Sequence, residues 1–124
     1  MPLLRVVLPL TACLFAGACD NDARERAARL TGGQPDRGRD LLRTYGCQSC
    51  HTIPGVTGAN GLVGPPLTRI ASRVYVAGHL PNTPENLMRW IRHPRQVSAD
   101  TAMPDTGVTE KDARHIAAYL YTLR

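Results

Sequence analysis

The chain has 124 residues, a mass of 13.5 kDa and a formal charge of +5 at pH 7. Its length suits one domain, and only 5% of its residues are aromatic, which excludes a core built from many rings. The apolar fraction of 43% argues against a disordered chain. A small domain with so few rings is expected to need a further stabiliser, such as a disulfide, a metal or a cofactor.

The charge is carried by fourteen arginines and a single lysine, Lys111. These arginines are dispersed and no nucleic-acid-binding motif accompanies them, so nucleic acid is not an expected partner. A basic surface of this kind favours an acidic protein patch or an anionic membrane surface.

Residues 1–18 have the pattern of a secretory signal peptide. Arg5 precedes an apolar segment of thirteen residues, 6–18, which is shorter than the roughly 20 residues of a membrane-spanning helix. The small residues before Cys19 resemble the lipobox of bacterial lipoproteins, in which the cysteine is acylated. We therefore expect Cys19 to become a lipidated N-terminus, anchored on the periplasmic side of the bacterial inner membrane. The alternative is simple cleavage near Ala18, which would give a soluble periplasmic protein.

Residues 19–34 predict a flexible tether between the lipid and the folded domain. The segment is polar, its three arginines balance three acidic residues, and it ends in Gly32 and Gly33. No apolar face is sustained along it, so at most one helical turn is expected, around residues 23–30. The folded domain is then expected to cover residues 35–124.

The first helix of the domain is predicted over residues 36–45, and Gly46 ends it directly before the cysteines. Cys47, Cys50 and His51 form a C-x-x-C-H sequence, the attachment motif of haem c. Two thiols three positions apart reach the two vinyl groups of one haem edge, and the adjacent His51 offers its imidazole to the iron. We therefore predict one covalently bound haem c, with His51 as an axial ligand.

Three other uses of these cysteines remain as alternatives. A thioredoxin-like redox pair normally follows a strand in a βαβ unit, and no β-branched run precedes Cys47. A structural zinc site needs four ligands, and the sequence has no second cysteine pair in the domain and no His-x-x-x-His. A plain disulfide between Cys47 and Cys50 is compatible with an exported protein.

Two further helices complete the predicted elements. One runs from the capping residue Thr83 to the residue before Pro94, and the last begins at the capping residue Thr109. Strand signals are limited to residues 74–76. The predicted fold is therefore all-α.

Two methionines compete for the second axial position on the iron. Met88 falls within the helix that begins at Thr83 and is expected to fill the core. Met103 lies in a polar loop, and Pro104 restrains its backbone. We predict Met103 as the ligand, because a His/Met pair favours electron transfer at a raised potential. The other side chains of the domain that could ligate the iron are His79, His93 and His115.

The domain resembles the class I cytochromes c over residues 35–124. The stretches that carry the resemblance are Gly38-x-x-Leu41-Leu42-x-x-x-Gly46, C-Q-S-C-H, Gly64-Pro65-Pro66-Leu67, residues 86–94 leading to Met103-Pro104, and residues 116–120. This resemblance implies three to five helices wrapped round one covalently attached haem c. It also implies a closed His/Met iron site rather than a catalytic centre.

The resemblance also assigns roles to single residues. The Pro65 carbonyl would accept a hydrogen bond from His51, and Leu67 would belong to the same cofactor-binding loop. Trp90 would pack beside the sulfur of Met103. The terminal helices would cross where Gly38 faces Tyr119 or Leu120. The residues chosen for the haem propionates are Arg69 and Arg73.

Residues 64–94 are especially similar to cytochrome c domains fused to subunit II of some haem-copper oxidases. The resemblance therefore implies a monomeric electron carrier, not an enzyme, with redox proteins such as an oxidase or a cytochrome bc complex as partners. The expected flow of electrons is toward a terminal oxidase. The alternative function is a haem enzyme or a gas sensor with an exchangeable sixth ligand.

Overall fold

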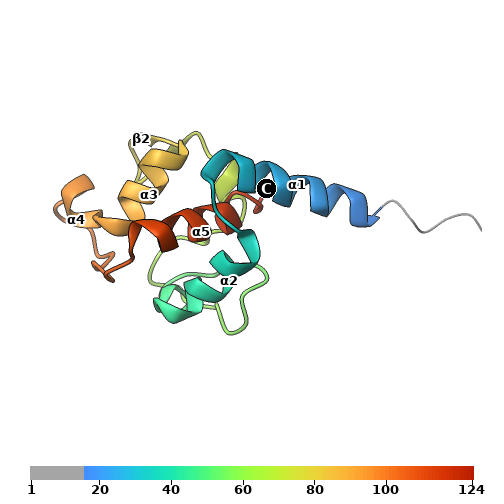
Figure 1. Ribbon diagram of the computed structural model, residues 1–124. Coiled ribbons are helices and arrows are strands. Elements are labelled where there is room, and N and C mark those ends of the chain that lie inside the picture. The colour runs from blue at the N-terminus through green and yellow to red at the C-terminus, as the bar shows by residue number, and fades with distance from the viewer. Residues whose placement is uncertain (1–15) are drawn as a thin grey trace, which may run out of the picture.

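The computed structural model describes residues 16–124, so most of the expected signal peptide lies outside the described residues. Within them the chain forms five α-helices, two 3-10 helices and one antiparallel hairpin, which confirms the all-α prediction (Figure 1). The elements are α1 (Ala16–Thr31), α2 (Pro35–Thr44), η1 (Cys47–Ser49), η2 (Ile70–Ser72), β1 (Tyr75–Val76), β2 (Leu80–Pro81), α3 (Pro84–Arg92), α4 (Pro94–Val97) and α5 (Glu110–Leu120).

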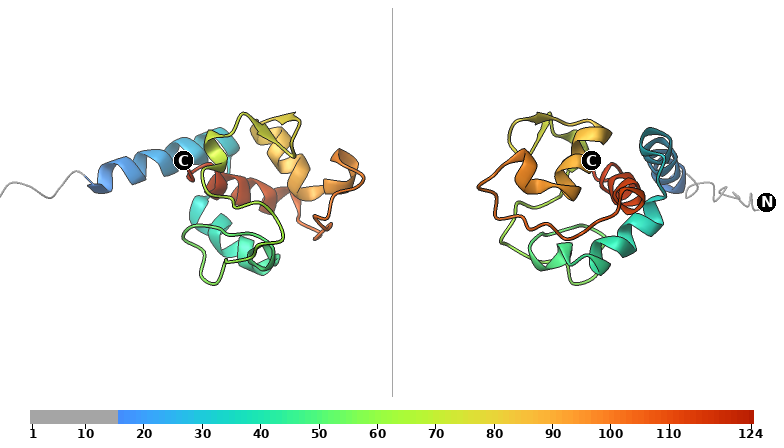
Figure 2. Two further views of the ribbon diagram at one scale, coloured as in Figure 1. Left: turned by 180° about the vertical axis from the view of Figure 1, so that it is seen from behind. Right: turned by 60° about the vertical axis from the view of Figure 1, so that its left-hand side comes forward.

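Helix α5 is the centre of the fold and lies between α2 and α3 (Figures 1 and 2). Leu42 of α2, Leu87 of α3 and Ile116 of α5 are each only 1% exposed. Because α5 packs against elements on several sides, seven of its eleven residues are buried. The core therefore consists mainly of aliphatic and small side chains, and its buried aromatic rings are Tyr119 and Tyr121.

Helix α2 approaches α5 closely because Gly38 has no side chain. A Cβ atom at Gly38 would lie 1.8 Å from the carbonyl oxygen of His115. The expected close approach is therefore present, but the predicted partner residues were wrong. Gly38 faces His115 and Ile116, about one helical turn before Tyr119 and Leu120. Tyr45, at the end of α2, fixes the crossing further, since its hydroxyl lies 2.7 Å from a carboxylate oxygen of Asp112.

The capping residues that the sequence indicated begin their helices as expected. The Thr83 hydroxyl accepts a hydrogen bond from the backbone N–H of Asn86, and Pro84 takes the first position of α3. The Thr109 hydroxyl accepts in the same way from Asp112 at the start of α5. Acidic residues in both first turns complement the positive end of the helix dipole.

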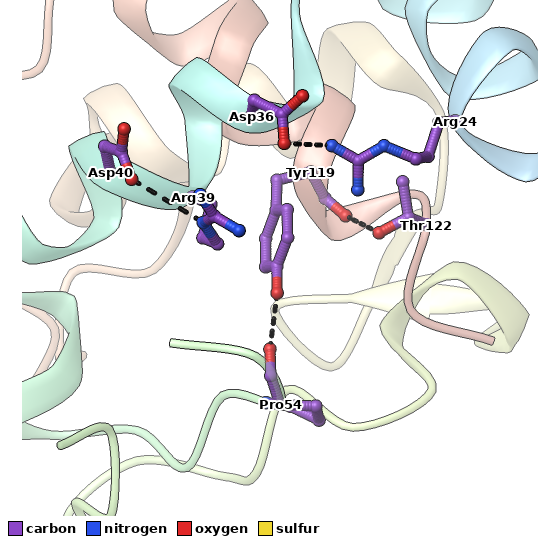
Figure 3. A network of polar contacts seen from close by, with 7 residues as sticks. All are labelled: Arg24, Asp36, Arg39, Asp40, Pro54, Tyr119 and Thr122. Atoms are coloured by element: carbon purple, nitrogen blue, oxygen red, sulfur yellow. Dashed lines mark hydrogen bonds and ion pairs between the residues drawn. The ribbon is translucent and has the colours of Figure 1, made fainter. Parts of the chain in front are cut away.

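The prediction of a flexible tether over residues 19–34 is wrong, because this segment is mostly helical. Helix α1 ends at Thr31 and packs against α5 through small side chains: Ala27 is 2% exposed and Thr31 is 4% exposed. Arg24 also forms an ion pair with Asp36 at the start of α2 (Figure 3). The N-terminal half of α1 extends beyond the rest of the fold (Figure 1).

The two 3-10 helices, the hairpin and helix α4 were not predicted. Tyr75 pairs with Pro81, and Val76 with Leu80, so the short strand signal is half of a hairpin. Pro94 ends α3 as expected but also begins α4, a single helical turn. The loop that carries Met103 therefore starts after α4.

Candidate functional site

The C-x-x-C-H sequence forms one tight turn directly after α2. Gly46 adopts a left-handed conformation with φ of 78°, and the 3-10 helix η1 follows it. The backbone N–H groups of Cys50 and His51 both donate to the carbonyl of Cys47, at 3.3 and 3.0 Å. This turn brings the two thiols and the imidazole into one short segment, and neither cysteine forms a disulfide.

The Cys47 thiol lies in surroundings that disfavour its charged form. Burial raises the pKa of Cys47 to about 11. A catalytic thiol of an oxidoreductase needs a lowered pKa, because the thiolate is the nucleophile. The environment of Cys47 therefore argues against a thioredoxin-like redox pair and suits a thiol held in apolar surroundings.

The His51 ring is oriented by a single backbone acceptor. Its Nδ1 atom lies 2.7 Å from the carbonyl oxygen of Pro65, the contact that the resemblance implies. Because a carbonyl can only accept, Nδ1 must carry a proton, and in the neutral ring Nε2 then keeps its lone pair. The hydrogen bond therefore selects the tautomer that can ligate a metal through Nε2.

Two glycines give the His51 segment its position. A Cβ atom at Gly64 would lie 2.4 Å from Cε1 of His51, and one at Gly61 would lie 2.5 Å from the carbonyl carbon of Cys50. The backbone N–H of Gly64 also donates to the Cys50 carbonyl at 2.7 Å. Sequence reasoning gave these glycines no role of their own, although Gly64 belongs to the Gly-Pro-x-Leu stretch.

Hydrogen bonds from the backbone and from Arg73 fix the loop that contains Pro65. The backbone N–H of Leu67 donates to the Thr52 carbonyl at 2.8 Å. Arg73 donates to the carbonyl of Pro66 and, at 3.4 Å, to that of Thr68. The guanidinium of Arg73, expected on a propionate, therefore braces this loop. Gly64 and Pro65, which contact the ring, therefore belong to a loop that is itself hydrogen-bonded in place. We call this loop the cradle of His51; it fits a ring that binds a metal through Nε2.

Met103 and Trp90 come from other parts of the fold. Met103 lies in the loop between α4 and α5, is partly buried, and its backbone N–H donates to the Thr101 hydroxyl at 3.1 Å. Trp90 is a partly buried residue of α3. Arg69, the other residue expected on a propionate, is exposed and has a left-handed φ of 58°.

The residue expected to carry a lipid is accessible. Cys19 is exposed and lies near the beginning of α1. In the described part of the chain, none of the helices has both the length and the apolar composition required to cross a membrane.

Comparisons with known proteins agree with this geometry. Residues 33–120 match the model of a family described as "Cytochrome C oxidase, cbb3-type, subunit III". The chain is also 33% identical, over 90 residues, to the cytochrome c oxidase subunit 2 of Alkalihalophilus pseudofirmus. That alignment covers 72% of this chain but only 25% of the relative, so the chain spans about a quarter of the relative's length. No solved structure matches the chain.

Proposed function

The chain belongs to the cytochrome c family of cbb3-type oxidase subunit III, and from this membership we propose that it carries single electrons between respiratory proteins. The family implies a covalently bound haem c, and Cys47 and Cys50 are the thiols available for its attachment. His51 and Met103 are proposed as the axial ligands. The observation that carries the proposal is the His51–Pro65 hydrogen bond of 2.7 Å, which leaves Nε2 free to bind iron.

The residues around His51 would keep the orientation of its ring the same in the oxidised and the reduced protein. When bound, the haem supplies a reversible one-electron couple. Pro65 holds the tautomer of His51, and Gly64 sets the height of the ring above the backbone. Arg73 keeps the Pro66–Thr68 loop in place by donating to its carbonyls. This division of roles requires no acid, base or nucleophile, which agrees with a carrier rather than an enzyme.

The proposed partners are an oxidase and an electron donor such as a cytochrome bc complex. The family description and the similarity to an oxidase subunit 2 support the first of these. We further propose that the protein is a monomer, attached by acylated Cys19 to the periplasmic side of the inner membrane. The exposure of Cys19 supports the attachment, since the lipid-transferring enzyme needs access to its sulfur.

Carbon monoxide tests the proposed iron site directly. A carrier with Met103 on the iron should bind carbon monoxide poorly in the ferrous state, whereas an enzyme or gas sensor with an exchangeable ligand should bind it rapidly. The matched variant is Met103→Ala, which should open the site and bind the gas quickly. Rapid binding to the native protein would overturn the closed His/Met site and favour the alternative function.

The anchor needs a separate test. Intact mass measurement of the protein from bacterial membranes should show loss of residues 1–18 and addition of a diacylglyceryl group. A Cys19→Ser variant should lose that addition and leave the membrane fraction. An unmodified soluble mature protein would contradict the anchor without affecting the proposed electron transfer.

A further inference from the structure

The junction between α1 and α2 is an ordered turn that packs against α5. The Thr31 hydroxyl donates to the Ala27 carbonyl at 2.8 Å and accepts from the Gly33 backbone N–H at 3.1 Å. A Cβ atom at Gly33 would lie 2.1 Å from the carbonyl oxygen of Arg114, so the junction approaches α5 at backbone distance. The position of α1 therefore depends on contacts that residues 31–34 make with α5.

One of those contacts uses a titratable side chain. The backbone N–H of Gln34 donates to Nδ1 of His115, at 2.9 Å and across 81 positions of sequence. His115 is 8% exposed, so water has little access to its ring. Because an N–H donor can only be met by a lone pair, Nδ1 must be unprotonated and the ring neutral, with its proton on Nε2. Within the described residues, Nε2 is buried and has no hydrogen-bond partner.

The surroundings of His115 oppose its positive charge. Gln34 is the residue that precedes α2, so Nδ1 faces the positive end of that helix. Charged groups bear on His115 from two elements: Arg37 from α2, and Asp112 and Lys111 from α5. Burial is the largest effect and lowers the pKa of His115, Arg37 and Lys111 lower it further, and Asp112 opposes them. At the same junction, Arg24 of α1 forms an ion pair with Asp36 of α2.

The other contacts of α1 use small or exposed side chains. The residues of α1 that α5 buries are small, chiefly Ala27 and Thr31. The Arg24–Asp36 ion pair is partly exposed, since the Asp36 side chain is 74% exposed, and such pairs contribute at most about 1 kcal/mol. Among these contacts, the hydrogen bond from Gln34 to His115 is the one that protonation of a histidine removes.

We propose that His115 is a pH-sensitive latch, whose protonation releases the junction 31–34 and helix α1 from α5. Protonation removes the lone pair of Nδ1 that accepts the Gln34 N–H, so two donors then face each other. It also places a positive charge beside the N-terminus of α2. The docked form favours the neutral ring, so its full stability is present above about pH 6.5, the ordinary pKa of histidine. That stability is lost as the pH falls from there through the lower pKa of the docked form. The cradle of His51, including the His51–Pro65 hydrogen bond, takes no part in the latch.

Hydrogen–deuterium exchange of the full-length holoprotein, followed by mass spectrometry, tests this proposal. Peptides from residues 19–34 are compared between pH 7.5 and pH 5.0, after correction for the intrinsic pH dependence of exchange. Since one proton is involved, exchange in α1 should accelerate by up to about tenfold per pH unit below pH 6.5. Peptides from α3 serve as the internal standard, and their protection should not change.

The decisive variant is His115→Asn, because the asparagine carbonyl can accept from Gln34 and does not titrate. This variant should keep α1 protected at pH 5.0, and His79→Asn, which removes an exposed histidine, should behave like the native protein. The proposal is overturned if α1 exchange in the native protein is independent of pH, or if His115→Asn shows the same acid response. If His115→Asn also loses protection in α3, a His115→Gln variant replaces it. An acid response of α1 in His115→Gln that equals that of the native protein overturns the proposal as well.

Discussion

Replacing Gly64 with alanine is expected to displace the His51 imidazole. The new methyl group would lie 2.4 Å from Cε1, 2.7 Å from Nδ1 and 2.9 Å from Nε2 of that ring. Ordinary van der Waals contact begins at 3.4 Å, so ring and backbone must separate by about 1 Å. The ring cannot tilt away freely, because Nδ1 is bonded to the Pro65 carbonyl at 2.7 Å and a hydrogen bond weakens beyond about 3.2 Å.

The cost of this change follows from two contributions. Forcing a methyl group into a packed site costs about 1–3 kcal/mol. Loss of an orienting partner of a metal-bound histidine typically reduces metal affinity or activity by about 10–100-fold. We therefore expect lower stability together with altered ligation of the iron, rather than a loss of stability alone.

The assay combines guanidinium unfolding of the holoprotein with absorption spectroscopy of the ferric form. Gly58→Ala is the matched control: it lies in the same loop and has open space for a methyl group, but its φ of 75° costs an L-residue about 1–2 kcal/mol. Gly58→Ala should lose stability and keep the native spectrum, whereas Gly64→Ala should change both. A Gly64→Ala protein with a native spectrum would refute the role assigned to the cradle.

Three other changes test separate parts of the structure. Gly38→Ala should destabilise the fold by several kcal/mol in chemical unfolding, because its methyl group would meet the His115 carbonyl oxygen at 1.8 Å; a loss below about 1 kcal/mol would contradict the close crossing of α2 and α5. Tyr45→Phe should cost about 1 kcal/mol at pH 7 by removing the hydrogen bond to Asp112. That bond lowers the pKa of Asp112, so its stabilisation is present above about pH 4 and should fade as the pH falls through the lowered value; a constant difference between variant and native protein down to pH 2 would be inconsistent with it. Finally, circular dichroism of a Cys47→Ala, Cys50→Ala protein made without haem should show little native helix, since the cofactor is expected to complete the core; full helix content would disprove this dependence.

The parts of the fold that could be predicted are those specified by residues close together in the sequence. Thr83 and Thr109 cap their helices because a hydroxyl three residues before a free backbone N–H needs no tertiary context. The turn from Gly46 to His51 is equally local, since its hydrogen bonds join neighbouring residues. For the same reason the cysteine motif can be interpreted from its residues and their spacing alone.

The parts that it missed depend on tertiary contacts. Helix α1 packs against α5 through small residues such as Ala27 and Thr31. These residues give only a weak periodic hydrophobic signal, so the sequence shows no continuous apolar face. The close approach of Gly33 to Arg114, and of Gly38 to His115, joins positions about eighty residues apart. The use of Arg73 on backbone carbonyls also follows from the path of the loop and not from its sequence.

Haem staining after denaturing electrophoresis tests the covalent attachment of haem, because only a covalently attached haem survives on the unfolded chain. We expect a stained band at the mass of the native protein and none for the Cys47→Ala, Cys50→Ala variant. A Met103→Ala protein should still stain, since that residue is assigned to the iron and not to the attachment. An unstained native protein with two thiols open to alkylation would contradict the attachment of haem to Cys47 and Cys50.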